Sequence, residues 1–207
     1  MNLSGRMHMR TGFTNSRRSV FAGLLLAVIL SPSLAHAHAG TAASGFLHGL
    51  AHPFTGLDHV CAMLAAGIWA AQLGRRVGRG VLLAFALCMV LGVWMGRAGV
   101  PIAFFESGIA LSLLVLGLLV AAAVRLPLLL AAGMAAVFAL FHGYAHGVES
   151  PYGASGLEYL LGIALASLLL NVCGVILAKR ADCGRRSRWL RYGGVGVALC
   201  GGILAMA

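Results

Sequence analysis

Residues 128–149 read LLLAAGMAAVFALFHGYAHGVE. The stretch is apolar for most of its length and long enough to cross a bilayer as a helix, since a span needs about 20 residues. Its last turns carry His142, His146 and Glu149. An ionisable side chain in a membrane costs on the order of a few kcal/mol, so it marks a functional site by default. The stretch therefore predicts both a membrane helix and a polar site at one end of it.

The apolar character extends along the whole chain, which is 60% hydrophobic and only 10% charged, with a mean hydropathy of +0.94. Soluble domains have roughly 25% charged residues. The composition predicts an all-α, polytopic membrane protein, and the absence of period-two alternation argues against a β-barrel. Among the 29 glycines, Gly92-x3-Gly96 and Gly143-x3-Gly147 have the spacing that lets membrane helices approach closely.

The first apolar run has the form of a secretory signal peptide. Arg17-Arg18 precedes the apolar residues 20–30, and Ala35-His36-Ala37 has the small-x-small pattern of a cleavage site. We expect a signal peptide over residues 1–37 and a single transmembrane domain over residues 38–207, with His38 as the new amino terminus. The alternative is an uncleaved first helix, although the run is shorter than a span.

Six further apolar segments have spanning length. They cover residues 57–73, 81–95, 102–124, 128–148, 157–178 and 190–206. Pro53 is expected to break or cap the first of them, with residues 46–52 forming a short helical piece ahead of it.

The distribution of basic residues predicts the orientation, because cytoplasmic loops collect Lys and Arg. With a periplasmic amino terminus, only Arg97 among the mature basic residues falls outside. The inside loops then hold Arg75, Arg76, Arg79, Arg125, Lys179, Arg180, Arg185, Arg186, Arg188 and Arg191. We expect a multi-pass inner-membrane protein with both mature termini periplasmic. The net charge of +10 then reflects topology rather than a nucleic-acid partner, and the basic loop also attracts anionic membrane lipid.

This orientation places two histidine motifs in the outer half of the membrane. On a helix, His142, His146 and Glu149 project from one face at successive turns. Near the first span, His52 and His59 are seven residues apart and flank Asp58. Asp58 could be a metal ligand, could accept the second ring proton of a ligating imidazole, or could be a buried helix cap.

At these residues the chain resembles the HupE/UreJ family of nickel permeases, which are associated with hydrogenase or urease maturation. The marks are His-x5-Asp-His at residues 52–59, Phe-His-Gly-x-Ala-His-Gly-x-Glu at residues 141–149, and Glu-Ser-Gly-Ile-Ala-Leu-Ser at residues 106–112. The resemblance implies nickel binding by His52, Asp58, His59, His142, His146 and Glu149. Further candidate ligands are His38, His48 and Glu106. The chain departs from the family pattern at Asn171, where a histidine often follows a Leu-Leu pair.

We therefore expect a permease and not an enzyme, with nickel or cobalt as transported substrate and no cofactor; zinc uses similar ligands. No nucleotide-binding loop is present, so the energy would come from a gradient or a partner. A homo-oligomer is compatible with such a chain. The alternative function is an intramembrane metal-dependent zinc hydrolase, although His-Glu-x-x-His is absent. Haem ligation would suit the histidine pairs but not the carboxylates beside them.

Four cysteines in apolar segments show no C-x-x-C spacing. We expect neither a disulfide framework nor a zinc finger from Cys61, Cys88, Cys173 and Cys200.

Overall fold

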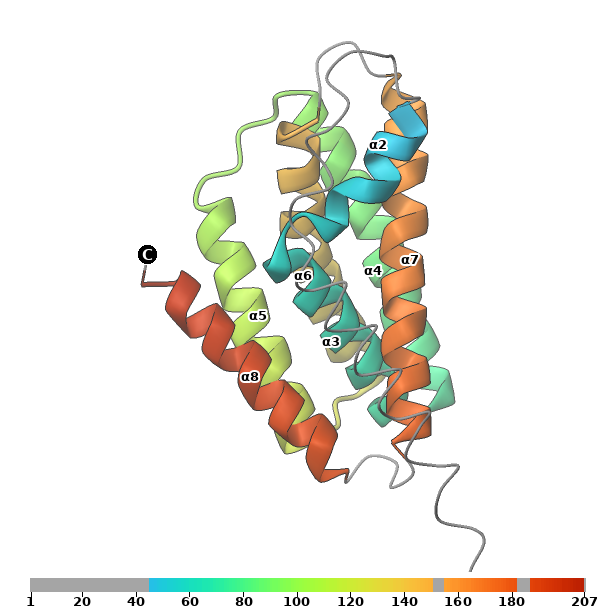
Figure 1. Cartoon of the computed structure of the whole chain (residues 1–207), viewed down its shortest axis with the longest axis vertical. Helices are drawn as coiled ribbons and strands as arrows, with labels where there is room; N and C mark the ends of the chain where they lie inside the picture. Colours follow the sequence, from blue (N-terminus) through green and yellow to red (C-terminus); the bar gives the residue numbers. More distant parts are fainter. Residues whose placement is uncertain (1–44, 151–154, 182–186, 207) are drawn as a thin grey trace, which may run out of the picture. The chain divides into compact units, whose positions relative to one another are not determined.

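The computed structural model describes residues 45–150, 155–181 and 187–206, and these residues form helices and contain no strand (Figure 1). The elements are α2 (Gly45–Ala51), the 3₁₀ turn η2 (His52–Phe54), α3 (Leu57–Leu73), α4 (Arg75–Arg97), α5 (Phe105–Ala122), α6 (Leu128–Val148), α7 (Gly156–Arg180) and α8 (Arg188–Leu204). The expected all-α fold is confirmed for these ranges. The expected signal peptide, its cleavage site and His38 lie outside the described residues.

Four of the helices are long and apolar enough to cross a membrane, namely α4, α5, α6 and α7. The number rises to five if α2–η2 and α3 together form one bent span. The remaining expected span corresponds to α8, whose 17 residues rise about 26 Å at 1.5 Å each, short of a hydrocarbon core of about 30 Å. The expected bounds are met for α3 and α6, whereas α4 begins six residues earlier than expected.

The chain bends sharply where Pro53 was expected to interrupt the first helix. The axis of residues Gly45–Phe54 makes an angle of 81° with that of α3. Pro53 lies in η2. The α-helix of α2 cannot continue through this residue, because proline lacks the N–H and clashes with the preceding turn. α3 then starts after Gly56, which has an extended backbone. The bend places His52 and His59 on two separate elements rather than on one face of one helix.

The helices pack in pairs, α4 on α6, α5 on α8, and both α2 and α3 on α7. The two Gly-x3-Gly motifs face each other in the first pair. A Cβ on Gly143 or Gly147 would collide with backbone carbonyls of α4, and a Cβ on Gly92 or Gly96 would collide with backbone carbonyls of α6. The predicted close approach is confirmed. This packing also sets the rotation of α6. Because Gly143 and Gly147 face α4, His142 and His146 face α3 and α5.

The basic residues lie mainly at one end of the helices, which we call the basic end. The carboxyl end of α5 meets α3 there, through a hydrogen bond from Trp69 Nε1 to the Val124 carbonyl and one from Gln72 Nε2 to the Val120 carbonyl, both 3.1 Å. Arg97 lies at the opposite end, with its guanidinium 5.9 Å from the centre of the Tyr159 ring. Both histidine motifs share the end of Arg97, since Gly147 of α6 packs against Gly96 and Arg97.

Candidate metal site

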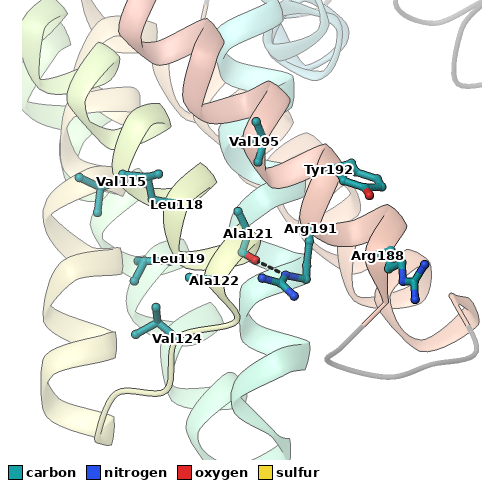
Figure 2. Close-up of a pocket in the computed structure, with 10 residues that line it drawn as sticks. All are labelled: Val115, Leu118, Leu119, Ala121, Ala122, Val124, Arg188, Arg191, Tyr192 and Val195. Atoms are coloured by element: carbon teal, nitrogen blue, oxygen red, sulfur yellow. Dashed lines mark hydrogen bonds between the residues drawn. The ribbon is translucent and has the colours of Figure 1, made fainter.

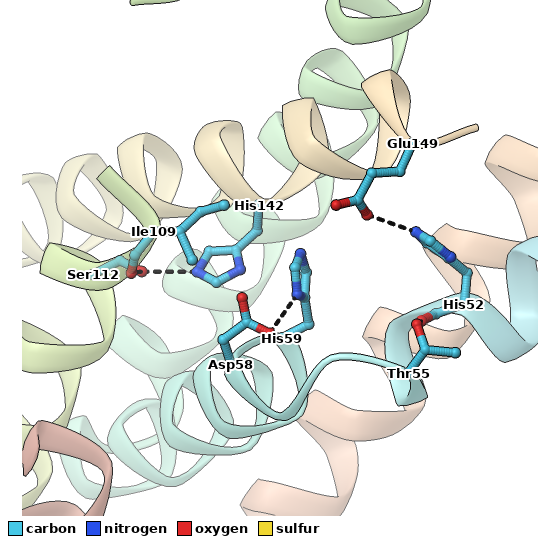
Figure 3. Close-up of polar contacts among 8 residues, drawn as sticks. All are labelled: His52, Thr55, Asp58, His59, Ile109, Ser112, His142 and Glu149. Carbon is cyan, nitrogen blue, oxygen red and sulfur yellow. Dashed lines mark hydrogen bonds and ion pairs between the residues drawn. The ribbon is translucent and has the colours of Figure 1, made fainter. Parts of the chain in front are cut away.

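Four histidines from three elements lie close together. The centre of the His146 ring lies 5.1 Å from that of His52 and 4.3 Å from that of His59, and the His59 and His142 rings are 5.1 Å apart. One possible ligand atom from each of His52, His146 and Glu149 lies within 4.8 Å of the other two. Together with Asp58, which contacts His59, the structure brings all six residues of the two motifs into one cluster. Figure 3 shows the five of them other than His146.

On the exposed side of the cluster, His52 and Glu149 are joined by a hydrogen bond. His52 Nε2 lies 3.0 Å from Glu149 Oε2, and the Glu149 side chain is 53% exposed. This hydrogen bond is the main cause of a lowered pKa for Glu149, which keeps the carboxylate ionised near neutral pH. The Thr55 hydroxyl donates to the His52 carbonyl at 2.7 Å and holds the short turn that carries His52.

Asp58 holds the ring of His59. His59 Nδ1 lies 2.9 Å from Asp58 Oδ1, and because a carboxylate only accepts, Nδ1 carries the proton; in the neutral ring, Nε2 then has the free lone pair. A Cβ on Gly56 would lie 2.6 Å from Asp58 Oδ1 and 2.8 Å from His59 Nδ1, so a side chain at this position would displace the contact between Asp58 and His59. Gly56 is the N-cap of α3 and no side chain caps the helix, which disfavours the cap alternative for Asp58.

A serine of α5 fixes the buried imidazole of His142. Ser112 Oγ lies 2.7 Å from the Ile109 carbonyl oxygen and 2.7 Å from His142 Nε2. The hydroxyl has one proton, which it donates to the carbonyl, so it accepts from Nε2–H of His142. His142 is thereby set in the tautomer whose Nδ1 has the free lone pair.

The free imidazole nitrogens are buried without a partner. His59 Nε2, His142 Nδ1 and both nitrogens of His146 have no hydrogen-bond partner among the described residues, and His142 and His146 are 0% and 1% exposed. Leaving a buried polar atom unpaired costs about 1–3 kcal/mol, so such atoms are rare in structural positions. In the neutral form, imidazoles held in place by Asp58 and Ser112 are the ligand type that divalent nickel, cobalt and zinc prefer.

Three carboxylates line a recess beside the cluster. A cavity of about 570 Å³ is lined by Asp58, His59, Glu106 and Glu149, together with Ser107 and apolar residues of α5, of α6 and at the carboxyl end of α8. A recess lined by negative charge attracts cations. Glu106 is exposed at this recess, and the exposed His48 ring stacks on His52 at 6.2 Å between centres. Of the three further candidate ligands, two therefore border the cluster and His38 is outside the described residues.

Two residues at the site were not predicted as part of it. Ser112 was visible only as one letter of the family motif, where nothing marked its hydroxyl as an imidazole partner. Tyr159 is fully buried on α7, donates its hydroxyl proton to the His146 carbonyl at 3.0 Å, and places its ring 6.0 Å from that of His52. A tyrosine in an apolar segment gives no sequence signal for such a role.

Asn171 lies away from the cluster. Its backbone packs against Gly67, eight residues or about 12 Å beyond His59 along α3, and its amide donates to the Ser167 carbonyl at 2.9 Å. The departure from the family pattern at this position therefore leaves the six clustered residues in place.

The described cysteines Cys61, Cys88, Cys173 and Cys200 are free.

Comparison with known proteins agrees with the motifs. The model of the "HupE / UreJ protein" family matches residues 25–204. The protein HupE of Rhizobium leguminosarum bv. viciae is 40% identical over 185 residues, which cover 88% of this chain and 92% of that protein. No solved structure matches the chain. The chain, with both histidine motifs inside the matched range, belongs to the HupE/UreJ family.

Proposed function

We propose that the protein is a permease for a divalent transition-metal ion, nickel in the first place and cobalt as the closest alternative, which supplies hydrogenase or urease maturation. The observation that carries the proposal is the set of buried imidazole nitrogens with no protein partner, next to a recess lined by carboxylates. Six residues act as ligands or hold ligands, and these are His52, Asp58, His59, His142, His146 and Glu149.

The arrangement suggests an order of events. The ion meets the exposed carboxylates first, where Glu149 and His52 lie beside His146. It then exchanges these ligands for the buried nitrogens of His59, His142 and His146. His146 belongs to both sets, so the ion never has to lose all protein ligands at once. Binding has to stay moderate at each step, because an ion held too tightly does not leave.

The ligand chemistry favours late first-row metals. Imidazole with one or two carboxylates suits nickel, cobalt and zinc, and their affinity order alone does not determine which is carried. The family match gives no support to the hydrolase alternative.

We extend the proposal to the membrane arrangement expected from the sequence. It has six spans after a cleaved signal peptide, both mature termini in the periplasm, and the histidine cluster in the outer half of the inner membrane. The basic end then faces the cytoplasm, in agreement with the distribution of Lys and Arg.

Nickel accumulation in cells that lack other nickel importers tests the proposal. We expect Asp58→Asn to lower uptake at least about tenfold, because partners that orient ligating histidines typically change metal affinity 10–100-fold. His59→Ala should abolish uptake. Glu158→Gln is a matched control, since Glu158 is an exposed carboxylate outside the cluster that accepts from the Gly45 N–H, a role that an amide can keep.

Each variant should reach the membrane in normal amount. Normal nickel uptake by both Asp58→Asn and His59→Ala would overturn the proposal. Cobalt and zinc as competitors in the same assay rank the three metals.

A further inference from the structure

A second recess lies at the basic end, between the carboxyl end of α5 and the start of α8 (Figure 2). It has a volume of about 730 Å³ and an apolar wall that includes Val115, Leu118 and Val195. Leu118 and Val195 are 53% and 45% exposed, so the wall is open on the side that faces away from the other helices. In a membrane protein, that side is in contact with lipid chains.

Two arginines lie at one end of this apolar wall. Arg188 and Arg191 are on successive turns of α8, and the residues that line the recess include no carboxylate to neutralise them. The Nε of Arg191 donates to the Ala121 carbonyl at 2.7 Å. That bond uses one of the five guanidinium N–H donors and fixes the direction of the group, which leaves donors for an anion.

The arginines lie where the chain is expected to meet the membrane surface. Arg188 is the first residue of α8, so the positive end of the helix dipole adds to the two guanidinium charges. Trp189 and Tyr192 are 82% and 66% exposed beside them, with ring centres 6.3 Å apart. Exposed Trp and Tyr next to basic residues are typical of the boundary between lipid chains and headgroups.

We propose that this recess binds one anionic phospholipid of the leaflet at the basic end. The lipid phosphate contacts Arg188 and Arg191, and an acyl chain lies along Val115, Leu118 and Val195. The combination of apolar wall, paired arginines and interfacial aromatics matches a molecule with a negative head and an apolar tail. This site is separate from the metal cluster and does not depend on which ion is carried.

Native mass spectrometry of the full-length protein, with phosphatidylglycerol or phosphatidylcholine added at equal concentration, tests the proposal. We expect one phosphatidylglycerol to be retained preferentially. The double variant Arg188→Gln, Arg191→Gln should weaken that binding roughly tenfold or more, since each basic residue near a lipid surface contributes measurably to anionic lipid binding. The double variant Arg75→Gln, Arg76→Gln removes the same charge from exposed positions at the same end and should leave the bound lipid in place.

Arg191 also links α5 to α8, so Arg188→Gln alone provides a variant that keeps this bond. It should lower the affinity for phosphatidylglycerol several-fold with normal folding. Equal retention of both lipids by the unaltered protein would overturn the proposal. So would equal loss of phosphatidylglycerol in the two double variants, which would mean that only overall charge attracts the lipid.

Discussion

Buried polar side chains at the two ends of the molecule are treated in opposite ways. At the basic end, the buried Trp69 and Gln72 each donate to a backbone carbonyl at the end of α5, as does the exposed Arg191. These carbonyls lie where α5 stops, with Ala123 in a left-handed conformation, and helix ends leave such groups without helical partners. Two buried side-chain oxygens outside the histidine cluster, Gln72 Oε1 and Asn171 Oδ1, have no partner among the described residues.

At the opposite end, the buried imidazoles of α3 and α6 make no hydrogen bond to a backbone group among the described residues. His59 and His142 are each held through one ring nitrogen, by Asp58 and Ser112, and the other nitrogen is left unpaired. Polar residues in this apolar chain therefore have two different roles. Side chains that satisfy backbone groups stabilise the fold, whereas side chains that are oriented by neighbours and still unpaired cost stability and are available to a ligand.

The largest effect is expected at His146, whose two ring nitrogens both lack a partner. His146→Leu should abolish nickel uptake and leave the thermal stability of the metal-free protein unchanged or higher, because it removes unpaired buried polar atoms while keeping apolar volume. Nickel uptake in cells measures the transport activity, and the melting temperature of the purified protein measures the stability. A marked loss of stability together with normal specific uptake would place His146 with the structural polar residues and break the comparison.

A smaller effect is expected at Ser112. Ser112→Ala removes the acceptor for His142 Nε2–H, so that the Nδ1 lone pair is no longer fixed toward the cluster. We expect the affinity for nickel to fall about 10–100-fold, as is usual for residues that orient ligands. Isothermal titration of the purified protein with nickel measures the change.

Ser167→Ala is the matched control for Ser112→Ala. Ser167 is also a buried serine, and its hydroxyl donates only to the Ile163 carbonyl, at 2.8 Å. It should keep the nickel affinity of the unaltered protein. Equal losses in the two variants would mean that the hydroxyl of Ser112 acts through helix packing and not through His142.

The smallest effect on transport is expected at the basic end. Trp69→Phe removes the donor to the Val124 carbonyl and should lower the free energy of unfolding by about 1–3 kcal/mol, with nickel uptake per folded molecule within about twofold of normal. Denaturation of the purified protein measures the stability. Trp94→Phe, at a position that is 60% exposed, is the control and should change neither quantity.

Much of the candidate site could be predicted from the sequence, because its residues occur in two short motifs with helical spacing. The spacing of His142, His146 and Glu149 predicted that their side chains lie on one face, along α6 and at its carboxyl end. The contact between His52 and Glu149 could not be predicted, because the chain bends by 81° between His52 and His59 and helical spacing no longer applies across the bend. Ser112 and Tyr159 were missed for a related reason, since a hydroxyl in an apolar segment shows no partner until the helices pack.

The fold shows the same division. The sequence by itself determined the helical character, the break at Pro53, the pairing potential of the two Gly-x3-Gly motifs and the asymmetric distribution of charge, because each follows from local composition or spacing. Only the tertiary structure decided that these glycines face each other and turn the histidines of α6 toward α3. It also decided which imidazole nitrogens stay unpaired. Pairing depends on atoms that lie tens of residues apart in the chain, and local spacing carries no information about them.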